Sequence, residues 1–269
     1  MIGAIIGDIC GSTYEFANPE KEEDVVLFTK NSQFTDDTVM TLANAEWLLS
    51  GKHTKENLLN IMKKYGKLYP TVGYGSMFKK WLNSDSLEDY GSYGNGSAMR
   101  VSPIGFYAQT IEECIKLTEI SAKTTHGHFE GIRGAEAIST AIFMARKGLT
   151  KEEIKVFIES SFKYNLNLDL NKIGRKAHKF DATCQVTVPE ALVCFLKSES
   201  FEDCIKKCIT IGGDTDTIAA MAGGIAEAYY GIPEHIIEWA KLYLNKDIID
   251  LYANFESNVK KNKSLFEEN

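Results

Sequence analysis

Residues 138–153 read ISTAIFMARKGLTKEE and carry the clearest helical signal in the chain. Four apolar side chains recur there at the spacing of one helix face: Ile138, Ala141, Ile142 and Ala145. Two basic residues and Gly148 follow, and both features suit the C-terminus of a helix. Thr150 then predicts the start of a second helix, because a Thr with a Glu three residues later, here Glu153, forms a reciprocal N-terminal cap.

The same signals recur along most of the sequence. Thr54 and Thr110 each precede a helical pattern, and residues 39–49 form another that ends before a glycine. The five prolines, Pro189 among them, fall at the edges of these patterns. Alternating strand patterns are scarce, and residues 165–187 are the least legible stretch. We therefore predict an all-α protein with about ten helices.

The domain organisation follows from length and composition. The chain has 269 residues with 44% hydrophobic content, enough apolar material for a sizeable core. No Pro/Gly/Ser-rich linker or block of charge divides it, so we expect one compact domain over residues 1–269. No apolar run approaches the roughly 20 residues that a bilayer-spanning helix needs. Membrane insertion is therefore excluded.

The charge balance limits the classes of partner. With 30 Lys+Arg against 37 Asp+Glu, the formal net charge is −7. The longest basic cluster lies at residues 259–263, which is too short for an extended nucleic-acid footprint. The chain opens without a basic leader, and its six cysteines are dispersed, so we expect a reduced, cytoplasmic monomer. Cys204 and Cys208 lie one helical turn apart and suit either a soft metal or ordinary buried thiols.

Three glycines near the N-terminus share one helix face. Gly3, Gly7 and Gly11 are spaced four residues apart, so a helix would align them and let another backbone approach closely. A glycine in a helix interior costs about 1 kcal/mol relative to alanine. These three therefore predict either a tightly packed helix or a nearby site.

Two acidic motifs stand at predicted helix starts. Residues 34–38 read FTDDT and residues 212–217 read GGDTDT, so each motif places two Asp between Thr hydroxyls. One such Asp is most simply a helix cap. Two matching motifs without His or Cys supply only hard oxygen donors, which suit Mg²⁺, Mn²⁺ or Ca²⁺. If the two helix starts converge, they predict a two-cation site.

Other polar residues suggest a site less directly. Glu15 follows the glycine-bearing segment and suits either a site at the end of that helix or a solvated surface. Residues 93–100 read YGNGSAMR. Such a loop could bind an anion together with the N-terminus of the helix that follows, or it could form a simple turn. His126 and His128 could be ligands or a hydrogen-bonded pair at a helix cap.

Taken in order, these motifs resemble the ADP-ribosylglycohydrolase family, which includes the dinitrogenase-reductase-activating glycohydrolase and the ADP-ribosyl-acceptor hydrolases. The resemblance rests on six segments that extend over nearly the whole chain: GAIIGD at 3–8, YEF at 14–16, FTDDT at 34–38, GNGSAMR at 94–100, TH at 125–126 and GGDTDT at 212–217.

The resemblance implies a compact all-α fold with two Mg²⁺ or Mn²⁺ ions in a cleft. It implies metal ligands at both acidic motifs: Thr35, Asp36, Asp37, Asp214, Asp216 and Thr217. It implies a catalytic carboxylate among Glu15, Asp36 and Asp37. It implies substrate contacts, with the diphosphate on the glycine-rich loop, at Tyr93, Asn95, Gly96, Ser97, Ala98, Met99, Arg100 and His126.

The implied activity is metal-dependent hydrolysis of the N- or O-glycosidic bond between ADP-ribose and a modified acceptor. The expected partner is an ADP-ribosylated protein, with arginine favoured, or a small ADP-ribosyl substrate. Serine, nucleobase and ester acceptors stay open, because the loops at 69–77 and 165–180 that would contact the acceptor cannot be placed. Two other functions stay open: a non-catalytic ADP-ribose or nucleotide binder, and a two-metal phosphohydrolase acting on a nucleotide diphosphate.

Overall fold

Helices account for the secondary structure of the computed structural model, which describes residues 1–173 and 180–267. No strand occurs in these two ranges, so the all-α prediction is confirmed. The helices are α1 (Ile2–Gly11), α2 (Asp36–Leu49), α3 (Lys55–Leu68), α4 (Ser76–Leu82), α5 (Gly96–Met99), α6 (Ser102–Tyr107), α7 (Ile111–Ala122), α8 (Phe129–Arg146), α9 (Lys151–Phe162), α10 (Leu170–Ile173), α11 (Cys184–Lys197), α12 (Phe201–Ile211), α13 (Thr215–Tyr230), α14 (Glu234–Lys241) and α15 (Lys246–Glu267), with a short 3₁₀ segment, η1 (Glu22–Asp24).

The predicted caps are in place at the helix starts. Thr54 and Thr110 accept a hydrogen bond from the backbone three residues on. Thr150 forms the full reciprocal cap with Glu153, as its spacing predicted. At Thr110 the corresponding Glu113 carboxylate instead accepts from the Gln109 backbone, at 2.7 Å. These local bonds satisfy N–H groups in the first turn of each of these three helices. The residues that form them are close together in the sequence, so the helix starts could be predicted from it.

Two details of the prediction were wrong. The expectation of about ten helices missed short ones such as α4, α5, α6 and α10, of four to seven residues, which are too short for a visible period. Pro189 was expected at the edge of a helix but lies inside α11. A proline removes one backbone hydrogen bond there, and packing of a largely buried helix compensates for it.

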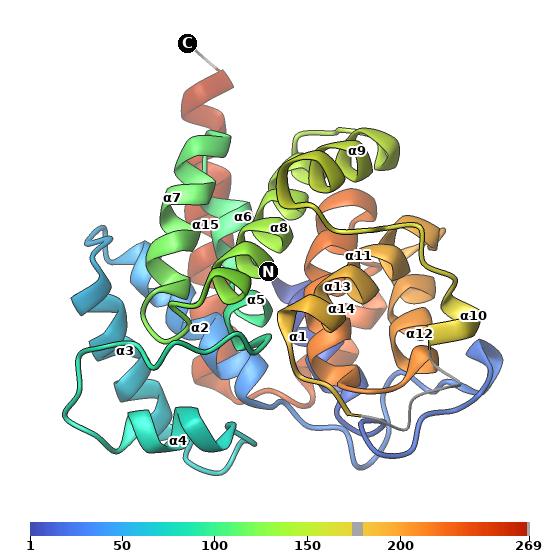
Figure 1. Ribbon diagram of the computed structural model, residues 1–269, viewed down its shortest axis with the longest axis horizontal. Coiled ribbons are helices and arrows are strands. Elements are labelled where there is room, and N and C mark those ends of the chain that lie inside the picture. Colours follow the sequence, from blue (N-terminus) through green and yellow to red (C-terminus); the bar gives the residue numbers. More distant parts are fainter. Residues whose placement is uncertain (174–179, 268–269) are drawn as a thin grey trace.

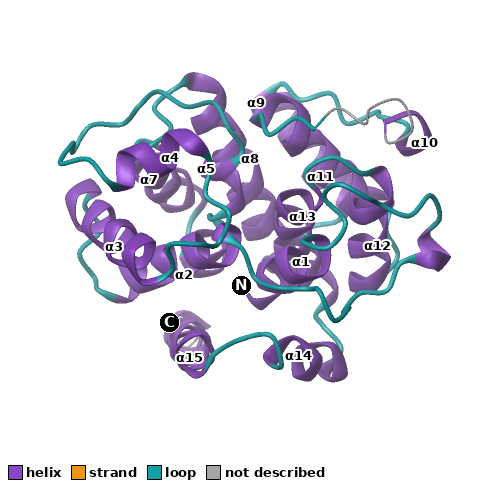
Figure 2. Cartoon of the chain, turned by 90° about the horizontal axis from the view of Figure 1, so that it is seen from below, coloured by secondary structure: helices purple, strands orange, loops and turns teal. Residues whose placement is uncertain are grey.

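Helix α1 lies at the centre of the molecule, packed along α13 (Figures 1 and 2). A Cβ on Gly7 would lie 2.0 Å from the Ala219 carbonyl oxygen, and one on Gly11 would lie 2.5 Å from the Asp216 Cα. The glycine face therefore allows the direct approach of two backbones, as the spacing predicted. This contact places the C-terminal end of α1 beside the start of α13, where one acidic motif lies.

Two sets of helices flank this central pair. In both views α2, α3 and α7 lie to one side of α1, and α10 and α12 lie to the other. Helix α8 packs against α7, α13 and α11, and so joins the two sets through one continuous core. The starts of α2 and α13 therefore face each other across the middle of the fold.

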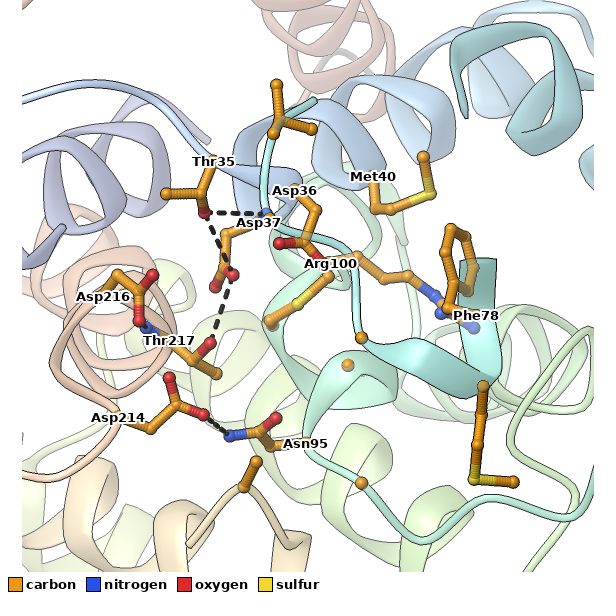
Figure 3. Close-up of a pocket in the computed structure, with 18 of the residues that line it drawn as sticks. Thr35, Asp36, Asp37, Met40, Phe78, Asn95, Arg100, Asp214, Asp216 and Thr217 are labelled. Atoms are coloured by element: carbon orange, nitrogen blue, oxygen red, sulfur yellow. Dashed lines mark hydrogen bonds between the residues drawn. The ribbon is translucent and has the colours of Figure 1, made fainter. Parts of the chain in front are cut away.

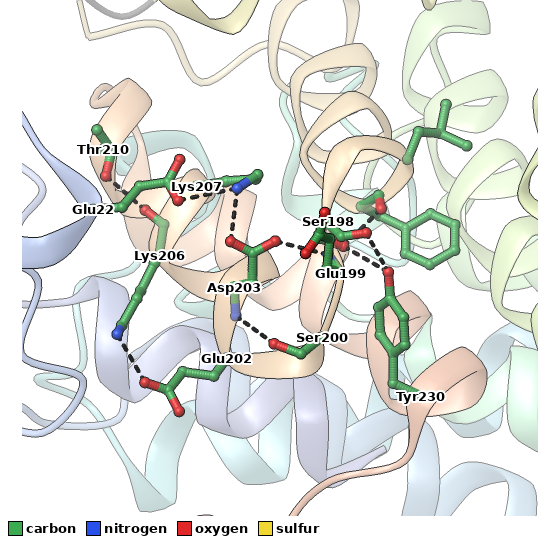
Figure 4. Close-up of polar contacts among 12 residues, drawn as sticks. Glu22, Ser198, Glu199, Ser200, Glu202, Asp203, Lys206, Lys207, Thr210 and Tyr230 are labelled. Atoms are coloured by element: carbon green, nitrogen blue, oxygen red, sulfur yellow. Dashed lines mark hydrogen bonds and ion pairs between the residues drawn. The ribbon is translucent and has the colours of Figure 1, made fainter.

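Helix α12 leads into the second acidic motif and is held at several points (Figure 4). Ser200 caps its start by accepting from the Asp203 backbone at 3.1 Å. Lys207 pairs with Asp203 at 2.7 Å and with Glu22 of η1 at 3.0 Å. The segment after α1 is thus attached to α12 through a partly buried ion pair.

The described residues also bear on two expectations drawn from the composition, one about membrane-spanning helices and one about the cysteines. No helix in the described part of the chain is long and apolar enough to cross a membrane. All six cysteines are free and buried. Cys204 and Cys208 lie on the buried face of α12, and no group of potential metal ligands found in residues 1–173 and 180–267 includes a cysteine.

Candidate metal centre and substrate cleft

The starts of α2 and α13 converge on one point. Thr35 caps α2, and its hydroxyl oxygen accepts from the Asp37 backbone at 3.3 Å. Gly212 and Gly213 adopt positive φ angles of 76° and 80°, which turn the chain sharply into α13. The Thr217 hydroxyl of α13 then donates to the Asp37 Oδ2 at 3.1 Å (Figure 3). The two acidic motifs therefore meet across a distance of 180 residues in sequence.

Carboxylate oxygens gather at this junction in two overlapping groups. One consists of Asp8, Asp37 and Asp216, and the other of Glu15, Asp214 and Asp216; within each group the oxygens lie within 4.8 Å of one another. Asp36 stands beside them, partly exposed, and lines the same cleft. An all-oxygen set of this kind suits Mg²⁺, Mn²⁺ or Ca²⁺.

The electrostatics of the cluster favour added positive charge. Burial, reinforced by the Asp216 carboxylate, raises the pKa of Asp36 to about 8 and that of Glu15 to about 7. The same two causes raise the pKa of Asp37 and of Asp214 well above the usual range. The ionised carboxylates therefore destabilise one another without a compensating cation.

A second observation shows that divalent cations fit these residues. The Asp37 Oδ1 is buried and has no hydrogen-bond partner. A buried carboxylate oxygen without a partner carries a large desolvation cost, which a coordinated cation would offset. The donor set, the mutual repulsion and this unpaired oxygen are all consistent with a site built for cations.

Asp8 is a member of the cluster to which the sequence alone assigned no role. Its carboxylate is fully buried and accepts from the Thr35 backbone at 2.9 Å, the Thr35 hydroxyl at 2.7 Å and the Thr38 backbone at 3.0 Å, and also from the Thr38 hydroxyl. Four donors use the acceptor capacity of one carboxylate. Asp8 therefore holds the first turn of α2 in place and orients Asp36 and Asp37. Its own oxygens have little capacity left to bind a cation. The signal in the sequence was a single charge in the otherwise apolar α1.

We expect Asp8→Asn to weaken cation binding without unfolding the protein. The amide keeps one acceptor oxygen but replaces the other by a donor that faces the Thr hydroxyls, so α2 should shift relative to α13. Loss of such a positioning contact typically costs about tenfold to a hundredfold in metal affinity. Calorimetric titration with Mn²⁺ and thermal unfolding measure the two effects. Unchanged Mn²⁺ affinity, with exposed Asp24→Asn as the control, would contradict the positioning role.

The glycine-rich loop at residues 93–100 forms part of one wall of the cleft and contacts the carboxylate cluster. The Asn95 side chain donates to the Asp214 Oδ2 at 2.8 Å, and its backbone donates to the Ala182 carbonyl at 2.8 Å (Figure 3). Gly96 lies against His126, since a Cβ there would be 3.2 Å from the His126 Nε2. Asn95, Gly96 and His126 line the cleft together with Met99.

Other residues expected to contact substrate are placed differently. Ser97 and Ala98 are buried beneath the loop and do not line the cleft; the Ser97 hydroxyl donates to the Gly131 carbonyl at 2.7 Å. Tyr93 is exposed outside the lining, with its ring 5.2 Å from that of His128. Arg100 contributes to the wall, but its guanidinium is buried and donates to the Ser121 carbonyl at 2.7 Å.

The two histidines have separate environments. His126 is buried, and its Nδ1 lies 2.7 Å from the Thr125 hydroxyl. Burial and the neighbouring Arg100 lower its pKa well below the usual value, so its ring is neutral at physiological pH. His128 caps α8 by accepting from the Glu130 backbone at 3.1 Å. The cap interpretation is therefore confirmed for His128 alone, whereas His126 bonds to Thr125 instead of pairing with His128.

The remaining lining comes from segments that the sequence could not place. The cleft has a volume of about 480 Å³. One side is formed by residues of the loop before α4 and its first turn, including Thr71, Gly73 and Phe78. Phe180 and Ala182 also line the cleft. Both loops that were expected near the acceptor contribute residues to the cleft lining. Residues 174–179, in the second loop, lie outside the described residues.

Comparison with known proteins points to a single family. The family model for ADP-ribosylglycohydrolase matches residues 1–263. The chain is 27% identical to the human ADP-ribosylhydrolase ARH3, over 93% of this chain and 90% of that protein. It is 24% identical to the ADP-ribosylarginine hydrolase Tri1 of Pseudomonas putida (strain GB-1), over 90% of this chain and 72% of Tri1. A solved structure titled ADP-ribosylglycohydrolase-related protein complex has a similar fold, with a TM-score of 0.70 at 23% identity and 93% coverage of both chains.

Proposed function

We propose that this chain, which belongs to the ADP-ribosylglycohydrolase family, hydrolyses the glycosidic bond between ADP-ribose and a modified protein side chain, with arginine as the preferred acceptor. The observation that carries the proposal is the convergence of the two acid-bearing helix starts in one cleft. The relatives support it: ARH3 is an ADP-ribosylhydrolase, and Tri1 is an ADP-ribosylarginine hydrolase. Six free thiols suit a reducing compartment, and we place the protein in the cytoplasm.

The proposal includes two divalent cations, Mg²⁺ or Mn²⁺. The residues that would hold them come from both helix starts: Thr35, Asp36, Asp37, Asp214, Asp216 and Thr217. When bound, such cations supply Lewis acidity and positive charge for the oxygens of the distal ribose. Asp8 and Asn95 keep the carboxylates of the two helices in place, through Thr35 on one side and through Asp214 on the other.

The reaction requires one proton to be moved by the protein. Hydrolysis breaks the bond between the anomeric carbon and the acceptor nitrogen, joins the water oxygen to that carbon, and transfers one water proton to the leaving nitrogen. Glu15 suits this transfer, because it is half-buried beside Asp214 and Asp216 and its pKa is raised to about 7. Asp36, also partly exposed and with a pKa raised to about 8, is the second candidate, and the more deeply buried Asp37 the third.

The nucleotide would lie along the wall that carries the glycine-rich loop. We place the diphosphate against Asn95, Gly96 and Met99, with the neutral His126 ring beside the ADP-ribose. Arg100 supports this wall from beneath, through its bonds to Ser121 and Thr125. Ser97 acts in the same way through Gly131, so both are assigned to the shape of the subsite rather than to direct contact with substrate.

The charge of the cleft supports a cationic acceptor. Its described lining contains five carboxylates, Glu15, Asp36, Asp37, Asp214 and Asp216, and no lysine. Arg100 is the single arginine in that lining, and its guanidinium is engaged within the protein. With two divalent cations bound, the five ionised carboxylates still exceed the cations by one negative charge. That excess attracts the guanidinium group, which arginine keeps when it is attached to ADP-ribose, more strongly than it attracts a neutral hydroxyl acceptor.

Metal removal tests the proposed activity. We expect release of intact ADP-ribose from ADP-ribosyl-arginine, faster than from ADP-ribosyl-serine, and a loss of at least about a hundredfold when EDTA removes the cations. Chromatography of the products measures both, with Mg²⁺-saturated EDTA as the control. Activity undiminished by complete metal removal would contradict the cation role. Release of AMP or phosphate would instead identify a phosphohydrolase, and tight ADP-ribose binding without turnover would identify a binding protein.

A further inference from the structure

Two phenylalanines form an exposed pair at the mouth of the cleft. The rings of Phe16 and Phe180 stack with centroids 6.1 Å apart and planes 26° from parallel. Phe16 is 84% exposed and Phe180 is 51% exposed, so neither ring is there to fill the core. Phe180 lines the cleft, and Phe16 directly follows Glu15. We call Phe16 and Phe180 the aromatic pair.

The segment that carries Phe16 is fixed to the rest of the fold on both sides of the ring. The Tyr14 hydroxyl donates to the Val26 carbonyl at 2.9 Å. The Asn18 side chain donates to the Thr210 carbonyl at 2.9 Å, at the end of α12. Glu22 pairs with Lys207 of the same helix (Figure 4). These contacts hold the chain before and after Phe16, and its exposed ring is stacked on that of Phe180.

The surroundings of the aromatic pair favour a planar cation. Glu15 directly precedes Phe16 in the chain, and it is the one carboxylate of its group that we do not assign to the cations, because Asp214 and Asp216 are assigned to them. The face of an aromatic ring carries negative charge density, so it attracts a guanidinium, which also stacks on it. A neutral serine acceptor gains neither contact.

We propose that the aromatic pair is the specificity-determining contact for the acceptor, and that it selects arginine by stacking against the guanidinium beside Glu15. This inference rests on the proposed function, because it assigns the acceptor end of the same cleft. It also predicts which part of the substrate the pair contacts. Bare ADP-ribose, which lacks the acceptor, should bind independently of both rings.

The test compares Phe16→Leu and Phe180→Leu with Phe16→Tyr. An exposed cation–π contact predicts that each Leu variant loses about twofold to fivefold in kcat/KM for ADP-ribosyl-arginine and keeps its value for ADP-ribosyl-serine. Phe16→Tyr, which keeps the ring, should retain the preference for arginine. The calorimetric Kd for ADP-ribose should be unchanged in all variants. The matched control is Phe129→Leu, an exposed ring at the start of α8 outside the cleft lining.

Three results would overturn the inference: equal losses for both substrates, unchanged selectivity in both Leu variants, or weaker binding of ADP-ribose itself. The last would place the rings at the nucleotide end of the cleft.

If the wild-type protein releases no ADP-ribose, the proposed function is wrong, and the two substrates then serve as calorimetric probes. A loss of affinity in Phe16→Leu confined to ADP-ribosyl-arginine would still support the aromatic pair, and an equal loss would overturn it.

Discussion

Asp36→Asn and Asp214→Asn are each expected to abolish cation binding and turnover while the protein stays folded. Each substitution removes a charged oxygen donor from the converging helix starts, and activity should fall by more than about a hundredfold. The fold should survive because the raised pKa of both groups shows that their ionised forms are destabilised by their neighbours. A neutral amide relieves that repulsion, and in Asp214→Asn the amide oxygen can still accept the bond from Asn95.

Three measurements check this prediction: calorimetric titration with Mn²⁺, release of ADP-ribose, and thermal unfolding in EDTA. The unfolding temperature in EDTA should stay equal to that of the wild-type protein or rise. Asp85→Asn, an exposed carboxylate outside the cleft lining, is the matched control. Full turnover in either cleft variant would show that the ligand assignment is wrong. Protein that is unfolded at room temperature would show that the carboxylates have a structural role that we have not identified.

The metal-free protein is expected to lose stability as the pH rises from about 4 to 8. Asp8, Glu15 and Asp36 have pKa values of about 7, 7 and 8 in the folded chain, whereas unfolded Asp and Glu titrate near 4. The folded state therefore binds more protons across this range, and its stability falls as those protons are released. A tenfold change in proton affinity corresponds to about 1.4 kcal/mol, so the buried Asp8 alone predicts an effect of a few kcal/mol.

Thermal unfolding in EDTA across this pH range measures the effect, and the same series with saturating Mn²⁺ should show a much smaller slope. Asp36→Asn should also reduce the slope in EDTA, because it removes one of the titrating groups. Glu23→Gln, whose parent side chain is 75% exposed, controls for the overall negative charge. An unfolding temperature in EDTA that stays constant as the pH is raised through this range would contradict the mutual destabilisation of the carboxylates.

Much of the architecture could be predicted because its signals are local. The caps at Thr54, Thr110 and Thr150 lie within three residues of the N–H groups that they satisfy, so their spacing is visible in the sequence. The spacing of Gly3, Gly7 and Gly11 likewise predicted a close backbone contact, although not that α13 makes it. Short helices such as α5 could not be predicted, because four residues are too few to show a period.

The glycine-rich wall of the cleft shows the limit of such reasoning. Within residues 95–100, every residue was an equal candidate for substrate contact. The structure turns Asn95 and Gly96 towards the cleft but buries Ser97 against Gly131 and Arg100 against Ser121. Which way a side chain points in an irregular segment depends on the helices packed against it, and those helices are remote in sequence.

The sequence by itself determined the all-α class, the helix starts, the two acidic motifs and the resemblance to the family, since each depends on residue types at short spacing. Only the tertiary structure decided that the motifs meet, because the packing of α1 on α13 brings residues 37 and 217 into hydrogen-bonding distance. It also revealed Asp8 as the support of α2 and paired Phe16 with Phe180. Contacts between distant segments depend on how complete helices pack, and no local pattern specifies that packing.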